Sequence, residues 1–225
     1  MGMCKLCERS GFFFPVSPIG LCQSCAPVVN LETDQALRII SESEKLVNTS
    51  KKFETRLGRC DDIVIAAQRL LQFEERGIAM LNVPPSKIIA QALDRKNTLV
   101  VEYARELCDD AKRKALTATS SKARAATFTK ALVAARNLAV LAGGTPEIHA
   151  AITLLGDDVH RATFESFVEE AKKAEFKGNK KRALDQYLEA LYFLRTDDLD
   201  DILQAEKISG LEKRITTLGG TVPVP

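Results

Sequence analysis

Residues 33–76, TDQALRIISESEKLVNTSKKFETRLGRCDDIVIAAQRLLQFEER, decide the fold class of this chain of 225 residues. A register of alternating steps of four and three runs from Ile39 to Leu71, and most of its positions are apolar, with Ser43 and Ser50 among the exceptions. Such a register is typical of a heptad seam. No proline interrupts the stretch, and Gly77 follows it at a position that suits a helix end. The pattern predicts one continuous helix, which at about 1.5 Å per residue would be about 65 Å long and would need a partner along its length.

The next apolar stretch can supply that partner. The sequence VPPS at 83–86 predicts a helix start with Ser86 as N-cap, and apolar residues continue from Ile88 to Ala111. We therefore expect residues 30–112 to form a long antiparallel helical hairpin. The alternative is a coiled coil in which residues 33–76 pair with a second copy of the chain, giving a homodimer.

Four of the six cysteines lie in the first 25 residues, as the pairs CKLC and CQSC. Cys4, Cys7, Cys22 and Cys25 follow the spacing C-x2-C-x14-C-x2-C, which places four thiolates around one tetrahedral ion. Residues 1–29 resemble a zinc ribbon, although Glu8 and Ala26 stand where such knuckles often have glycine. We expect one structural Zn²⁺, because four protein ligands leave no open position for catalysis. The alternatives are rubredoxin-like iron in the same thiolates and a thiol redox switch.

Three aromatic residues, Phe12, Phe13 and Phe14, interrupt the loop between the two cysteine pairs. They could form the small core of the ribbon or cap the first long helix. Alternatively, they could be an exposed contact for a partner. Because Lys5 and Arg9 are the only basic residues nearby, the ribbon favours a protein partner over nucleic acid.

The bulk properties indicate a cytoplasmic protein. The hydrophobic content of 45% is enough for one large core or two smaller ones. No run of 18 apolar residues is present, and the amino terminus lacks the apolar segment of a signal peptide, so we expect no membrane span. A reducing, intracellular compartment also suits the free thiols.

A basic tract occupies the middle of the chain. Residues 111–146 contain seven Lys and Arg and no Asp or Glu, although the net charge of the whole chain is only +2. A break near KALTATSS and the pair Gly143–Gly144 predict a basic helix within residues 113–144. Its cations could contact a polyanion, including nucleic acid, or could simply be a solvated face paired with acidic residues elsewhere. The tract comprises Lys112, Arg113, Lys114, Lys122, Arg124, Lys130 and Arg136.

Residues 145–220 predict a compact helical module that begins with the cap Thr145 and Pro146 and restarts near Gly156. Residues 161–194, with Gly178 in the turn and Ala183, Tyr187 and Ala190 beyond it, resemble one tetratricopeptide repeat. With a third helix capped by Thr196, the segment also resembles a microtubule-interacting-and-trafficking domain. Either resemblance implies a helical groove that receives a peptide or helix of another protein. Residues 221–225 are expected to be a flexible tail.

No catalytic motif is present. The two histidines, His149 and His160, do not stand in an HExxH arrangement, and no nucleophile elbow, P-loop or dinucleotide fingerprint occurs. The sequence therefore predicts a mainly α, non-catalytic, zinc-binding adaptor or scaffold that binds other proteins. The alternatives are a nucleic-acid-associated factor that uses the ribbon and the 112–136 tract, and a thiol redox sensor.

Overall fold

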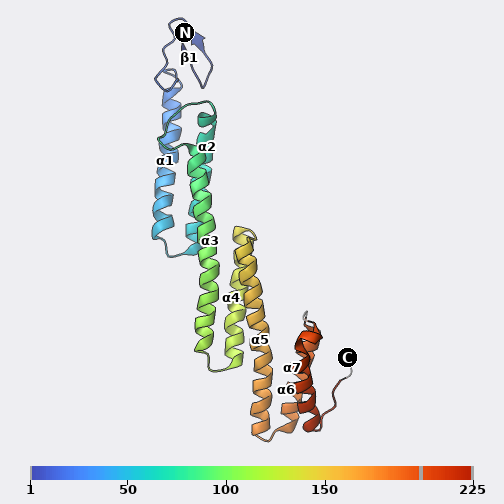
Figure 1. Ribbon diagram of the computed structural model, residues 1–225. Coiled ribbons are helices and arrows are strands. Elements are labelled where there is room, and N and C mark those ends of the chain that lie inside the picture. The colour runs from blue at the N-terminus through green and yellow to red at the C-terminus, as the bar shows by residue number, and fades with distance from the viewer. Residues whose placement is uncertain (1, 198–199, 224–225) are drawn as a thin grey trace. The chain divides into compact units, whose positions relative to one another are not determined.

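The computed structural model describes residues 2–197 and 200–223 and confirms that the protein is mainly α (Figure 1). The chain divides into two compact units, Met1–Tyr103 and Ala104–Pro225, and α3 contributes residues to both. The elements are β1 (Gly2–Met3), β2 (Ser10–Gly11), α1 (Ala26–Thr49), α2 (Phe53–Glu75), α3 (Pro85–Leu116), α4 (Ser121–Ala142), α5 (Pro146–Phe176), α6 (Lys180–Thr196) and α7 (Asp201–Thr217).

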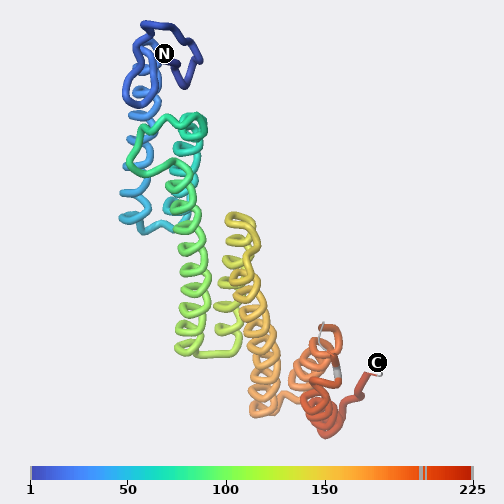
Figure 2. Tube along the Cα trace, turned by 45° about the horizontal axis from the view of Figure 1, so that its top comes forward, coloured from blue at the N-terminus to red at the C-terminus, as the bar shows by residue number. Residues whose placement is uncertain are grey.

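The continuous helix expected over residues 33–76 is wrong, because the chain turns back at residues 50–52 and α1 packs against α2 (Figure 2). Ser50 is extended (φ −70°, ψ 136°), and its hydroxyl accepts a hydrogen bond from the Lys52 N–H. Arg56 donates to the carbonyl of Val47, one of the last carbonyls of α1. Polar side chains thus satisfy backbone groups that a continuing helix would have paired internally.

The turn also changes which residues form the seam. Ile40 and Val47 are buried on α1, whereas Ile39, the residue predicted from the heptad register, is 37% exposed. The predicted hairpin of two long helices over residues 30–112 is therefore replaced by α1, α2 and the first part of α3. Here Phe53 of α2 stacks on Tyr103 of α3 with ring centroids 4.1 Å apart.

The end of α2 follows the prediction. Gly77 adopts φ +65° and donates to the Glu74 carbonyl, while the buried Ile78 donates to the Phe73 carbonyl. This is the Schellman pattern, in which a residue without Cβ takes the left-handed position. Ser86, the predicted N-cap, instead lies inside α3 and bonds the carboxylate of Glu74 through both its N–H and its hydroxyl.

In the C-terminal unit, α4 and α5 pack along each other, and a side chain caps the start of each helix. The cap of α5 agrees with the prediction, whereas no cap was predicted for α4. The Ser120 hydroxyl accepts from the Ala123 N–H, and the Thr145 hydroxyl accepts from the Ile148 N–H. The helix restart expected at Gly156 is wrong, because α5 runs unbroken from Pro146 to Phe176. Leu155 and Ala162 are buried on either side of that glycine, so packing holds the helix together through it.

The last three helices enclose an apolar cluster, and in both views α6 and α7 lie beside the C-terminal part of α5 (Figure 1, Figure 2). Gly178 adopts φ +72° in the turn between α5 and α6, as predicted, whereas Asp200 and not Thr196 caps α7. The buried members of the cluster are Ala171, Tyr187, Ala190, Leu191, Leu194, Leu211 and Ile215.

The described part of the predicted tail is in contact with this cluster. Val222 packs against it, and the Pro223 carbonyl accepts a hydrogen bond of 2.6 Å from Arg195. The remaining residues of the predicted tail, 224 and 225, lie outside the described residues.

Candidate metal centre

Two tight turns bring the amino-terminal cysteines together. The first follows β1, which pairs with β2 through Gly2 and Gly11, and the Glu8 N–H closes the turn on the Cys4 carbonyl at 2.9 Å. Glu8 itself adopts φ +61°, the left-handed conformation for which glycine is better suited. The second turn leads directly into α1, because the Ala26 N–H donates to the Cys22 carbonyl at 2.9 Å.

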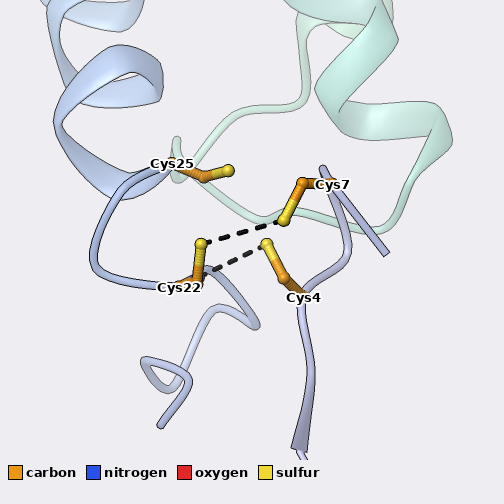
Figure 3. A group of neighbouring side chains, drawn as sticks. All are labelled: Cys4, Cys7, Cys22 and Cys25. Carbon is orange, nitrogen blue, oxygen red and sulfur yellow. Dashed lines mark hydrogen bonds between the residues drawn. The ribbon is translucent and has the colours of Figure 1, made fainter. Parts of the chain in front are cut away.

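The four sulfur atoms face a common centre, and all lie within 4.8 Å of one another (Figure 3). The Sγ atoms of Cys7 and Cys22 are 3.9 Å apart. In a tetrahedral thiolate site with metal–sulfur bonds of about 2.3 Å, neighbouring sulfurs are about 3.8 Å apart. The cluster therefore needs only a small contraction to hold one metal ion. It is the only group of three or more such ligands within residues 2–197 and 200–223.

The thiols have unequal proton affinities. Burial raises the pKa of the Cys4 thiol, but backbone hydrogen bonds from Cys7 and Cys22 outweigh burial and hold the pKa at about 6. Backbone hydrogen bonding from Cys25 lowers the pKa of Cys22. The hydrogen bond to Cys22, followed by burial, raises the pKa of Cys25 to about 12. Four adjacent sulfurs cannot all be anionic without a cation between them, so the geometry and the charges both suit a divalent ion.

Two contacts that sequence spacing did not predict fasten the first cysteine pair to the turn between α2 and α3. The Lys5 ammonium donates to the Gly77 carbonyl at 2.5 Å, and the Arg76 guanidinium donates to the Leu6 carbonyl at 2.5 Å. The partners are separated by 72 and 70 residues, so no local pattern in the sequence signals them. They join the cysteine cluster to the helices of the same unit.

The aromatic loop is mostly exposed. Phe12 and Phe13 are 77% and 92% exposed and meet edge to face with centroids 5.4 Å apart, so neither forms a core or a helix cap. Phe14 is partly buried, and its carbonyl lies 2.5 Å from where a Cβ on Gly2 would stand. A side chain at position 2 would therefore displace the loop that presents the two rings.

The seven residues of the basic tract do not form one continuous patch of free cations. Arg113 and Lys114 pair with Asp110 on the last turns of α3, at 3.5 and 2.5 Å. Arg124 pairs with Glu165 of α5 at 3.0 Å. Lys122, Lys130 and Arg136 are exposed on α4, and Lys112 is exposed on α3. Part of the tract is thus neutralised by nearby carboxylates.

A groove of about 680 Å³ lies between α5 and α7 in the C-terminal unit. Phe164, Val168 and Leu211 supply apolar surface, and Gly210 has no atom within 4 Å of where its Cβ would be. The groove also includes Lys172, Glu175, Phe176, Tyr187, Lys207 and Arg214. Its size is within the range of ordinary binding pockets.

The carboxylate in this groove is already engaged. Glu175 accepts hydrogen bonds from the Tyr187 hydroxyl at 2.9 Å and from the Arg214 guanidinium. Burial raises the pKa of Glu175, but these two donors outweigh burial and the pKa is lowered. The Lys207 ammonium lies 5.4 Å from the centroid of the Phe164 ring. With Glu175 neutralised by Arg214, Lys172 and Lys207 leave the groove positive.

Comparison with protein-family models, with curated proteins and with solved structures finds no match to the chain. In the described part of the chain, α4 is the one helix whose length and composition would let it cross a bilayer, a test that core helices of soluble proteins also pass. The expectation that no segment spans a membrane stays a prediction.

Proposed function

We propose that this protein is a non-catalytic, intracellular adaptor in which one structural Zn²⁺ organises the amino terminus and the groove between α5 and α7 receives a segment of another protein. The groove is the observation that carries the proposal, because it combines an apolar lining with a positive rim. The metal centre supports the structural role of the ion, because four cysteines fill a tetrahedral site completely.

The choice of zinc rests on the ligand set. Four thiolates bind Zn²⁺ or iron, and Zn²⁺ undergoes no redox change that would disturb a structural site. Metal analysis of protein purified under reducing conditions tests this choice. One equivalent of zinc supports it, whereas iron with the visible absorbance of its thiolate complex contradicts it.

The chemistry of the groove supports one class of ligand. An amphipathic helix could place apolar residues spaced i, i+3 and i+4 on Phe164, Val168 and Leu211. Asp or Glu on the flanks of that helix would face Lys172 and Lys207. An acidic amphipathic helix is therefore the class of ligand that we propose.

A display library of amphipathic helices, selected on the full chain, tests the proposal. We expect acidic helices to be enriched and to lose at least tenfold in affinity for the variant Lys172→Glu/Lys207→Glu. Lys130→Glu/Arg136→Glu on α4 is the matched control, because it changes the net charge equally outside the groove. Enrichment of basic or purely polar peptides, or equal losses in both variants, would contradict the assignment.

A further inference from the structure

One face of α4 carries exposed cations and exposed aliphatic residues together. Six residues define this surface, which we call the α4 face: Lys122, Lys130, Val133, Arg136, Val140 and Leu141. Because successive residues of a helix are rotated by about 100°, these six fall within about 140° of the helix circumference. All six side chains are exposed to solvent. The opposite side of the helix is buried through Phe128, Leu132, Ala135 and Leu138.

The charge of the α4 face is uncompensated. No Asp or Glu occurs in α4, and within the described ranges the side chains of Lys122, Lys130 and Arg136 form no ion pair or hydrogen bond. Arg124, the fourth cation of the helix, lies on the other side of the wheel and pairs with Glu165. The face therefore lacks the internal carboxylates that neutralise other parts of the basic tract, and it complements an extended negative surface.

The aliphatic residues narrow the class of ligand. Val133, Val140 and Leu141 are 50%, 85% and 59% exposed and lie between or beside the cations. Nucleic acid offers phosphates to the cations but no apolar layer to the valines and the leucine. The surface of an anionic bilayer offers both, because acyl chains begin directly beneath the phosphate groups. Since the opposite side of α4 packs against α5, the helix would lie on such a surface and not cross it.

We propose that the α4 face binds the surface of an anionic lipid bilayer. Lys122, Lys130 and Arg136 contact headgroup phosphates and carboxylates, and Val133, Val140 and Leu141 enter the boundary between headgroups and acyl chains. This site is separate from the groove between α5 and α7, and it does not depend on the adaptor proposal.

Sedimentation of the full chain with vesicles tests the site. One vesicle set contains phosphatidylcholine alone, and the other contains about 30% phosphatidylserine. We expect binding only to the anionic vesicles, weakening as NaCl rises from about 50 to about 500 mM. Because each cation near the surface contributes about fivefold in affinity, Lys130→Glu/Arg136→Glu should lose at least about 25-fold. Lys172→Glu/Lys207→Glu, which changes the net charge equally, should bind like the wild type.

A fluorescence experiment reports the apolar contact directly, because the chain contains no tryptophan. Val140→Trp should shift its emission to the blue on anionic vesicles and be quenched by brominated lipid. Tyr192→Trp, at a position on α6 where the native side chain is 67% exposed, should show neither change. Circular dichroism of each variant checks that the helices are intact.

Three results would overturn the proposal. The first is no binding to the anionic vesicles at the lowest salt. The second is binding of a DNA duplex under conditions where vesicles are not bound, which would assign the cations to nucleic acid. The third is an equal loss of vesicle binding in both charge-reversal variants, which would mean that binding depends on the net charge of the protein and not on the α4 face.

Discussion

The amino-terminal turns and the carboxyl-terminal helices are held together by different forces. In residues 2–25, Cys4, Leu21 and Cys22 are the buried apolar side chains, and two of the three are metal-ligand candidates. In the last three helices, seven buried residues form one cluster, and four of them are Leu or Ile. A segment with so little apolar burial cannot offset its loss of conformational entropy, whereas the helical cluster can. The amino-terminal turns therefore lack an apolar core, and the four cysteines gathered there could hold a metal ion in its place.

Polar contacts follow the same division. In the C-terminal unit, side-chain contacts join elements that a core already holds, as in the ion pair between Arg195 and Glu212 at 2.7 Å and the hydrogen bond between the His160 ring and Asp197 at 2.5 Å. His160 also stacks on Phe193 with centroids 4.8 Å apart, so its surroundings are those of a structural side chain. In the N-terminal unit, Lys5 and Arg76 join the cysteine turns to the helices by hydrogen bonds to carbonyls. At the cysteine turns these polar contacts occur where few apolar side chains are buried.

The largest expected effect is the loss of the metal centre. Cys22→Ser removes one of four ligands, and structural sites of this kind contribute about 10–16 kcal/mol of apparent binding free energy. We expect bound metal to fall from one equivalent to none. In NMR spectra we also expect the amide chemical shifts of residues 2–25 to move to the values of an unfolded chain, while those of α5, α6 and α7 do not change.

Cys60→Ala is the control for this experiment. Cys60 is a buried cysteine of the same unit, and burial raises the pKa of its thiol, so it behaves as an apolar side chain. The variant should keep its metal. If Cys22→Ser kept its metal and its native amide chemical shifts, metal coordination would not be what stabilises residues 2–25.

The second prediction concerns the core of the C-terminal unit. Leu194 is fully buried in the cluster, so Leu194→Ala should lower the free energy of unfolding of this unit by about 2–5 kcal/mol. Leu194→Met conserves most of the volume and should cost less than about 1.5 kcal/mol. Chemical denaturation gives both values, and metal content should be unchanged in both variants. A loss of metal in Leu194→Ala would mean that the two regions are not separately stabilised.

Local signals in the sequence predicted the parts of the fold that depend on neighbouring residues. The cap of α5 at Thr145 and the turn glycines Gly77 and Gly178 were correct, because the backbone geometry there is decided within a few residues. The cysteine cluster was predicted for the same reason, since the x2 spacing forms a tight turn whatever surrounds it.

Features that depend on distant residues were missed. At the break between α1 and α2, Arg56 donates a hydrogen bond to the Val47 carbonyl, and Ile40 rather than Ile39 is buried in the core. The heptad pattern in the sequence does not show which of these two isoleucines is buried. Gly156 looked like a helix start because its neighbours Asp157 and Asp158 resemble a cap. Packing of α5 overrides that local preference. The bonds from Lys5 and Arg76 have no sequence signature at all.

The third prediction tests whether those two bonds strengthen the metal centre. Arg76→Met removes the donor to the Leu6 carbonyl, and a hydrogen bond of this kind contributes about 0.5–1.5 kcal/mol. Metal affinity, measured by competition with a chelator, should therefore fall by about two- to tenfold. Arg76→Lys, which keeps a cationic donor, should lose less. Equal affinity in Arg76→Met and the wild type would show that the cysteine turns need no support from the helices.

The smallest effect is expected from Glu169, whose carboxylate joins α4 to α5. It pairs with Lys173 at 2.8 Å and accepts from the Ser121 N–H at 2.8 Å, at the positive end of the α4 dipole. These contacts, led by the bond from Lys173, lower the pKa of Glu169 to about 2 from the ordinary value of 4.5. A lowered pKa in the folded state stabilises the protein at pH values above 4.5, and this contribution is lost as the pH falls from 4.5 through about 2. Glu169→Gln should therefore be less stable than the wild type at pH 7 and should lose less stability over that acid range. The free energy of unfolding of the C-terminal unit, measured by denaturation, gives the pH profile of each protein. Parallel profiles would show that protonation of the Glu169 carboxylate does not affect stability.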